Sequence, residues 1–149
     1  MIKILFVCHG NICRSPMAEF VMKDMVKKAG LEKHFEIASA ATSTEELGNP
    51  VHHGTRRKLS QVGISCAGKT ARQMNRRDYE HYDIIIGMDR YNMRNMERIC
   101  GGDPQGKLRK LLSRDVADPW YTGNFEDTYA DVLEGCTALL EEVRTEIYK

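Results

Sequence analysis

The sequence lacks the features that would place it outside the ordinary globular classes. No apolar run approaches the ~18 residues that a bilayer-crossing helix needs, and there is no repeat or low-complexity tract. Proline occurs only 4 times. These absences exclude a membrane protein, a disordered tail and a collagen-like chain. The apolar start has neither a basic leader nor a small-residue cleavage site, so we expect a cytoplasmic protein without a membrane partner.

Disulfide and metal-binding patterns are missing as well. The 5 cysteines are odd in number and irregularly spaced, in a chain long enough to fold without disulfides. No C-x-x-C pair occurs, and the 5 histidines do not combine with the cysteines at zinc-site spacings. We therefore expect neither a disulfide framework nor a structural metal.

The charge is nearly balanced overall but uneven along the chain. A formal net charge of +1 argues against a general nucleic-acid partner. Residues 47–77, however, carry seven Lys or Arg side chains and no carboxylate. Two interpretations stay open for this stretch, namely a solvated basic helix face or a surface that attracts an anionic partner.

The 149 residues (17.0 kDa) are the size of one domain, which we expect to span residues 1–149. Apolar runs predict strands at residues 2–7 and 82–88, and alternating polarity predicts one at 35–40. A short fourth strand is favoured within residues 108–112. Predicted helices begin after Ser15, at Asn49-Pro50, after Asp89 and at Phe125. This alternation favours an α/β fold with a parallel sheet and helices on both faces, and with ligands bound beyond the carboxyl ends of the strands.

Residues 8–15, between the first strand and the first helix, have the composition of an anion-binding loop. Unpaired N–H groups and the helix dipole favour an anion at a helix N-terminus. Gly10 permits a tight fold, and Asn11 tolerates left-handed backbone. Arg14 adds a planar fork that matches two phosphate oxygens. Ser15 stands where an N-cap belongs, with Pro16 at the first helical position.

Cys8 opens this loop, five residues before Cys13 and six before Arg14. An anion site favours the thiolate form of a cysteine that faces it, and the thiolate is the nucleophilic form. A tetrahedral oxyanion held by the loop would lie over the sulfur, and Ser15 could donate a hydrogen bond to it. The alternative is a buried strand-end thiol, because free cysteines are commonly buried.

Asp118 is the candidate proton donor. Expelling an alkoxide or phenoxide from phosphorus leaves a strong base, so an acid must protonate the leaving oxygen. Asp118 precedes Pro119, which favours extended backbone, and Trp120-Tyr121 would form an aromatic wall that partly desolvates the carboxyl. The alternative is an ordinary Asp-Pro turn.

Residues 7–19, VCHGNICRSPMAE, resemble the signature of the low-molecular-weight protein tyrosine phosphatases. Further matching segments follow in the family's order: Ser39-Ala40, Ala71-Arg72-Gln73, Met88-Asp89 and residues 117–121. The resemblance implies a four-stranded parallel sheet with a phosphate-binding loop after the first strand. It also implies metal-free, cofactor-free hydrolysis of phosphotyrosine in proteins or peptides, and of small aryl phosphates, through a phosphocysteine.

In this interpretation Cys8 attacks phosphorus, Arg14 clamps the phosphate and Asp118 serves as general acid and then general base. We expect a monomer or weak dimer, and we expect Cys13 to capture oxidised Cys8 as a disulfide. The expected substrate-binding residues are His9, Gly10, Asn11, Ile12, Cys13, Ser15, Glu45, Trp120 and Tyr121.

Two positions depart from the family pattern. Glu45 stands where the family commonly has an aromatic wall for the substrate ring, and Lys69 stands where a histidine usually supports the loop. Lys69 could be a second cation behind the loop, but we favour an exposed side chain.

Three other functions are compatible with parts of this pattern. Arginine phosphatases carry a threonine where this chain has Ile12. Thiol-linked arsenate reductases need two further cysteines close together, whereas Cys66, Cys100 and Cys136 are far apart. A non-catalytic phosphopeptide binder would not need Cys8, Arg14 and Asp118 together.

Overall fold

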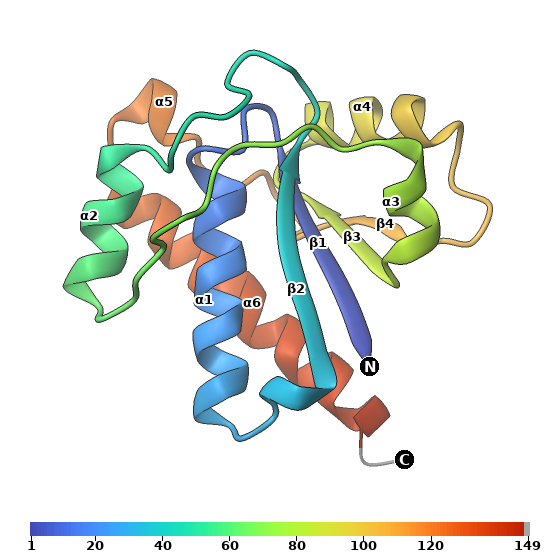
Figure 1. Ribbon diagram of the computed structural model, residues 1–149, viewed down its shortest axis with the longest axis horizontal. Helices are drawn as coiled ribbons and strands as arrows, with labels where there is room; N and C mark the ends of the chain where they lie inside the picture. The colour runs from blue at the N-terminus through green and yellow to red at the C-terminus, as the bar shows by residue number, and fades with distance from the viewer. Residues whose placement is uncertain (148–149) are drawn as a thin grey trace.

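Four parallel strands form the centre of the fold in the computed structural model, which describes residues 1–147 (Figure 1). Their order across the sheet is β2-β1-β3-β4. Their bounds are β1 (Ile2–Cys8), β2 (Phe35–Ala41), β3 (Ile84–Gly87) and β4 (Leu108–Lys110). The predicted single α/β domain with a parallel sheet is confirmed, although β3 and β4 are shorter than their apolar runs.

The central strand β1 is buried on both faces, which explains why its residues are apolar at both odd and even positions. Residues 4–7 are fully buried, because both faces of the sheet are covered. Ile4 and Phe6 belong to one core cluster, and Leu5 and Val7 belong to the other. The strand ends at Cys8, whose β2 neighbour is Ala41.

Helices cover both faces, as predicted. One core cluster joins the sheet to α1 (Arg14–Lys28) and α6 (Phe125–Ile147), and the other joins it to α3 (Arg76–His81) and α4 (Arg90–Cys100). Two short helices, α2 (His53–Gln61) and α5 (Pro119–Thr122), lie together to one side in Figure 1, and a 3-10 turn, η1 (Glu32–His34), precedes β2. No helix within residues 1–147 is long and apolar enough to cross a membrane.

Two predicted helix starts are wrong. Helix α1 begins at Arg14 with Cys13 at the N-cap, so Ser15 already lies inside the first turn. The Met17 N–H donates to the Cys13 carbonyl at 3.2 Å, so the helix begins earlier than Ser15-Pro16 predicted. Helix α2 begins at His53, capped by His52, instead of at Asn49-Pro50.

The reason for the second error is that Pro50 is used elsewhere: it forms an antiparallel bridge with Thr70. Helix α3 was not predicted at all. It has a single good signal, a reciprocal capping box between Asn75 and Asp78.

The basic stretch of residues 47–77 does not form one surface. Five of its seven cations lie on α2 and α3, which stand at opposite sides of the sheet in Figure 1, and Lys69 and Arg72 lie in the chain between these helices. Lys58 pairs with Glu126, and Arg72 pairs with Asp78. The structure therefore gives no support to a single anion-attracting face there.

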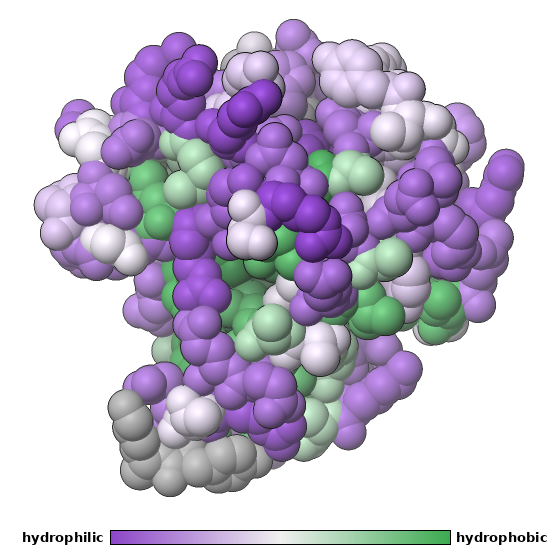
Figure 2. Space-filling view, turned by 180° about the vertical axis from the view of Figure 1, so that it is seen from behind, coloured by the Kyte–Doolittle hydropathy of each residue, from purple (hydrophilic) through white to green (hydrophobic). Residues whose placement is uncertain are grey.

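The two ends of the sheet differ in character. The loops after all four strands gather at one end, and the amino end of β1 and the last turn of α6 lie at the other (Figure 1). The reverse face is mostly hydrophilic, with apolar side chains reaching the surface in its middle (Figure 2). Any site built from strand-end residues must therefore lie at the loop end.

Candidate active site

A cavity of about 770 Å³ opens at the loop end of the sheet, and Cys8 lies in its wall. Four segments surround it: residues 8–14, the loop at residues 45–46, the first turns of α4, and residues 115–121. The chain thus brings together segments that are more than 100 residues apart.

Two polar groups lie within hydrogen-bond distance of the Cys8 sulfur. The Asn11 N–H donates to Sγ at 3.3 Å, and the Ser15 hydroxyl oxygen lies 3.0 Å from it. Cys8 is 4% exposed. An amide and a hydroxyl directed at one sulfur stabilise a negative charge there, so the geometry supports a thiolate nucleophile better than an inert strand-end thiol.

Asn11 shapes the loop from behind. Its φ of 58° is left-handed, as its residue type permits. The side-chain amide donates to Ser15 Oγ at 2.8 Å and to Ser39 Oγ at 2.9 Å, and its oxygen accepts from the Arg72 N–H at 3.2 Å. Asn11 is only 1% exposed. These bonds fix the curvature that directs the Asn11 amide at the sulfur.

Lys69 supports the same network, so the expectation of an exposed side chain was wrong. Its Nζ donates to the Ser39 carbonyl at 2.9 Å and lies 3.7 Å from Glu19 Oε1. Ser39 Oγ in turn donates to Glu19 at 2.5 Å, and Lys23 pairs with the other oxygen of this buried carboxylate. Burial lowers the pKa of Lys69, against the opposing effect of Glu19.

We expect Lys69→Met to weaken both the fold and the site. It leaves the buried Glu19 carboxylate with fewer compensating bonds, which costs about 1–3 kcal/mol of unfolding free energy. It also removes the hydrogen bond to the Ser39 carbonyl, which supports the network behind the loop. We therefore expect kcat for p-nitrophenyl phosphate to fall. Urea unfolding and steady-state kinetics measure the two effects.

Lys28→Met is the matched control for Lys69→Met, since Lys28 pairs with Asp24 on the exposed side of α1. It should leave both the urea midpoint and kcat nearly unchanged. Equal losses in the two variants would contradict a supporting role for Lys69.

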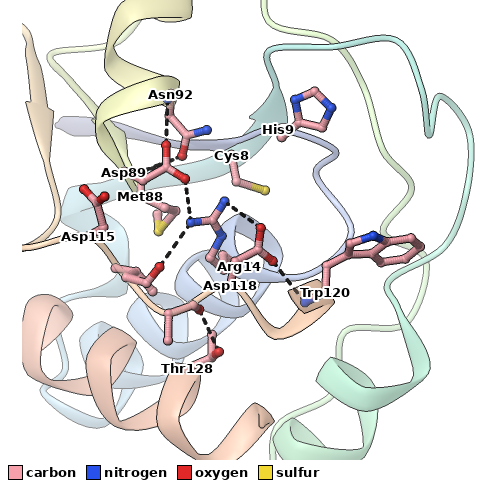
Figure 3. Close-up of polar contacts among 12 residues, drawn as sticks. Cys8, His9, Arg14, Met88, Asp89, Asn92, Asp115, Asp118, Trp120 and Thr128 are labelled. Atoms are coloured by element: carbon pink, nitrogen blue, oxygen red, sulfur yellow. Dashed lines mark hydrogen bonds and ion pairs between the residues drawn. The ribbon is translucent and has the colours of Figure 1, made fainter. Parts of the chain in front are cut away.

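Arg14 is buried below the cavity and held by three oxygens (Figure 3). One terminal nitrogen donates to Asp89 Oδ2 at 2.9 Å and to the Val116 carbonyl at 3.2 Å. The other lies 3.4 Å from Asp118 Oδ2. Burial alone would lower the pKa of Arg14, but Cys8, Asp118 and Asp89 together raise it above its ordinary value. Arg14 is thus a fixed cation beside the sulfur.

Asp89 has two functions, of which the sequence revealed one. It caps α4 as predicted: Oδ1 accepts from the Asn92 N–H at 2.8 Å, while Asn92 Oδ1 accepts from the Asp89 N–H at 3.2 Å. Its other oxygen holds Arg14. The cap of α4 therefore fixes the direction of the guanidinium.

Asp118 reaches the site from a well-anchored segment. The neighbouring Ala117 carbonyl accepts from Thr128 Oγ1 at 2.8 Å, and the Ala117 N–H donates to Asp131 at 3.0 Å, so α6 holds this segment (Figure 3). Asp118 Oδ1 accepts from the Trp120 N–H at 3.0 Å and caps α5. Its backbone is extended, as expected before a proline.

The aromatic wall around Asp118 differs from the expectation. Trp120 and Tyr121 line the cavity but are 63% and 85% exposed. The contacts of the Asp118 carboxyl are a backbone amide and Arg14, so desolvation by the two rings is not seen in this structure.

Cys13, the second cysteine of the loop, differs from Cys8 in its surroundings. Burial, with added repulsion from Cys8 and Asp118, raises the pKa of Cys13 to about 12. It therefore stays a thiol near neutral pH, so Cys8 is the candidate nucleophile of the pair.

Most of the other predicted site residues lie where they were expected. His9, Gly10, Ile12 and Glu45 line the cavity, and His9 Nε2 lies 2.8 Å from Glu45 Oε2. Asn11 and Ser15 do not line it, because both are buried behind the loop. Their contact with substrate stays a prediction, and the buried side chains place it on the backbone.

Several lining residues had no sequence signal. They are Glu46, Tyr91, Asn92, Asn95, Asp115 and Val116. Most follow β3 or lie near β4, and nothing in the local sequence shows that these segments face Cys8. Within residues 1–147, no group of three or more His, Cys, Asp or Glu side chains is placed to hold a metal ion.

Comparisons with known proteins agree with this arrangement. The model of the family "Low molecular weight phosphotyrosine protein phosphatase" matches residues 3–149. The low molecular weight protein-tyrosine-phosphatase YfkJ of Bacillus subtilis is 40% identical, over 98% of this chain and 98% of that protein.

Two solved structures are similar along nearly the whole chain. The crystal structure of YfkJ gives a TM-score of 0.95, covering 98% of this chain and 96% of that one. The crystal structure of SP-PTP, a low molecular weight protein tyrosine phosphatase from Streptococcus pyogenes, gives 0.90 at 42% identity, covering 96% and 93%.

Proposed function

This chain belongs to the low molecular weight protein tyrosine phosphatase family, and we propose that in it Cys8, Arg14 and Asp118 carry the hydrolysis of phosphotyrosine, with residues 1–149 acting as one phosphatase domain. One observation carries the proposal. The Cys8 sulfur, the Arg14 guanidinium and the Asp118 carboxyl line one cavity, with Arg14 and Asp118 3.4 Å apart.

In the first step the Cys8 thiolate attacks phosphorus in line with the leaving oxygen. An S–P bond forms and the P–O bond to the phenol breaks. Arg14 and the loop amides hold the three equatorial oxygens as charge shifts onto them. Asp118, entering protonated, gives its proton to the departing phenolate oxygen.

In the second step water attacks the phosphocysteine. Asp118, now a carboxylate, takes the proton from the water as the P–O bond forms. The S–P bond breaks, inorganic phosphate leaves and the thiolate is restored. Because phosphate monoesters are among the slowest substrates to hydrolyse without a catalyst, preorganised charges must supply most of the acceleration.

Activity on a panel of substrates tests the proposal. We expect kcat/KM to be highest for phosphotyrosine peptides, with turnover of p-nitrophenyl phosphate and little for phosphoserine. Ile12 lines the cavity where arginine phosphatases have a threonine, so phosphoarginine should also be a poor substrate. A preference for phosphoarginine, or no turnover of p-nitrophenyl phosphate, would contradict the proposal.

The proposal includes a phosphoprotein substrate, a cytoplasmic location and a monomer or weak dimer. Sedimentation velocity across a concentration series measures the oligomeric state. A tight dimer at nanomolar concentration would contradict that part.

Cys13 provides a prediction about oxidation. Peroxide should convert Cys8 to a sulfenic acid, which the Cys13 thiol can capture as a disulfide with loss of water. Since the pKa of Cys13 is raised to about 12, capture should speed up as pH rises from 6 to 9. Mass spectrometry of quenched samples measures the disulfide.

The variant Cys13→Ser tests the same role by recovery of activity. Dithiothreitol should restore less activity to this variant than to wild type after peroxide treatment. Unchanged recovery, or a capture rate that is independent of pH, would reject the resolving role.

A further inference from the structure

The mouth of the cavity carries an unusual share of the exposed apolar surface. Tyr91, Trp120 and Tyr121 line the cavity and are 56%, 63% and 85% exposed. Exposed aromatic side chains gathered around one pocket are typical of a surface that binds a polypeptide. The residues around these rings should therefore contact what flanks the phosphorylated side chain.

One side of the mouth is acidic. Glu45 and Glu46 line it, on the loop that follows β2. Glu45 is exposed and is held at the rim by the His9 ring. Glu46 accepts a hydrogen bond from Asn49, a neutral partner, at 2.6 Å. Within residues 1–147, no basic side chain lies within ion-pair distance of Glu46.

On the other side of the mouth the lining carboxylates, Asp89 and Asp115, are paired with Arg14 and with Lys110, and a basic stripe on α4 lies next to them. Arg90, Arg94 and Arg98 are four residues apart on α4 and form one stripe along the helix. The guanidinium carbons of Arg90 and Arg94 lie 5.5 and 5.8 Å from the Tyr91 ring centroid. Arg90 pairs loosely with Asp115 at 4.0 Å.

The charge on this stripe is mostly uncompensated. Within residues 1–147, neither Arg94 nor Arg98 has a carboxylate within ion-pair distance, and both are exposed. Tyr91 thus lines the cavity and lies beside the first two arginines of the basic stripe.

The acidic and basic sides face each other across the catalytic group. Figure 3 shows Asn92 of α4 and Asp115 on one side of Arg14, and His9, the partner of Glu45, on the other. A phosphotyrosine whose phosphate lies on Arg14 must enter between them. Its two flanks in the polypeptide then meet charges of opposite sign.

We propose that this two-sided rim selects phosphotyrosine segments that are acidic on the flank facing α4 and basic on the flank facing Glu45 and Glu46. The inference rests on the proposed function, because it requires the phosphate to bind at Cys8 and Arg14. Exposed ion pairs are individually weak and screened by salt, so the expected selectivity is about 3–10-fold in kcat/KM, arising from several contacts together.

Two phosphotyrosine peptides of equal composition test the proposal. One has two aspartates before the phosphotyrosine and two lysines after it, and the other has the reverse order. Since peptide direction is the only difference, we expect one of them to be the better substrate by about 3–10-fold at low salt, and the ratio to fall towards one in 0.5 M salt.

Charge reversal on the protein identifies the residues responsible. The double variant Glu45→Lys, Arg94→Glu should invert the preference between the two peptides, and Arg94→Ala alone should bring the ratio closer to one. The double variant Arg77→Glu, Glu80→Lys is the matched control, because both residues are exposed on α3 and neither lines the cavity. It should keep the wild-type ratio.

Equal kcat/KM for the two peptides in wild type, or a preference that the Glu45 and Arg94 reversal leaves in its original sense, would overturn the proposal. Turnover of p-nitrophenyl phosphate, which has no flanks, is measured in parallel. If wild type fails on that substrate, the proposed function itself is wrong. If wild type turns it over and shows no peptide preference, only the rim inference is wrong.

Discussion

Replacing Cys8 by serine is expected to lower kcat for p-nitrophenyl phosphate by about 10⁴-fold or more, as does loss of the nucleophile in other covalent enzymes. The serine hydroxyl is not ionised near neutral pH, whereas the loop around Cys8 is arranged to stabilise a sulfur anion. Phosphate or vanadate should still bind, since Arg14 and the loop amides are retained. Steady-state kinetics and calorimetric titration measure the two properties.

Cys13→Ser is the control for this experiment. Cys13 lies in the same loop, but its raised pKa keeps it a thiol, so its replacement should leave most of the activity. Rapid quenching of wild type with labelled substrate should trap phosphate on sulfur. Activity of Cys8→Ser within tenfold of wild type would rule out Cys8 as the nucleophile.

Asp118→Ala should have the next largest effect, a loss of about 10²–10⁴-fold with phenyl phosphate, whose leaving group needs protonation. The loss should be much smaller with p-nitrophenyl phosphate, because p-nitrophenolate departs with little proton assistance. A leaving-group series measured for both proteins gives the difference as a steeper dependence of kcat/KM on leaving-group pKa in the variant.

Asp115→Asn is the matched control, since Asp115 lines the same cavity but pairs with Lys110 and Arg90. Its effect should be similar for good and poor leaving groups. Equal losses with both substrates in Asp118→Ala would show that Asp118 is not the proton donor.

Sequence reasoning succeeded where the signal is local. The apolar run of β1, the composition of residues 8–15 and the Asp89 cap each depend on neighbours within a few residues, and all three appear in the structure. The resemblance added the number of strands, the phosphotyrosine substrate and the phosphocysteine, because thirteen consecutive residues and Asp118 matched a known pattern.

The failures share a physical cause, which is contact between distant segments. Lys69 lies behind the loop only because the chain brings it to Ser39 and Glu19, 30 and 50 residues away. Tyr91 lines the cavity because β3 ends beside β1, which no periodicity reveals. Ser15 was predicted as the N-cap but lies inside the helix, because the Cys13 carbonyl accepts the first helical hydrogen bond.

The location of the loops at one end of the parallel sheet, with Ile2 and Ile147 at the other, affects how the protein can be attached to a surface (Figure 1). A tether fused near either of these residues would leave the mouth of the cavity facing the bulk solution. Macromolecular substrates could then approach an immobilised molecule without steric obstruction from the support. Biosensor measurements of substrate-trapping variants should therefore give the same association rates whichever end of the chain carries the tether.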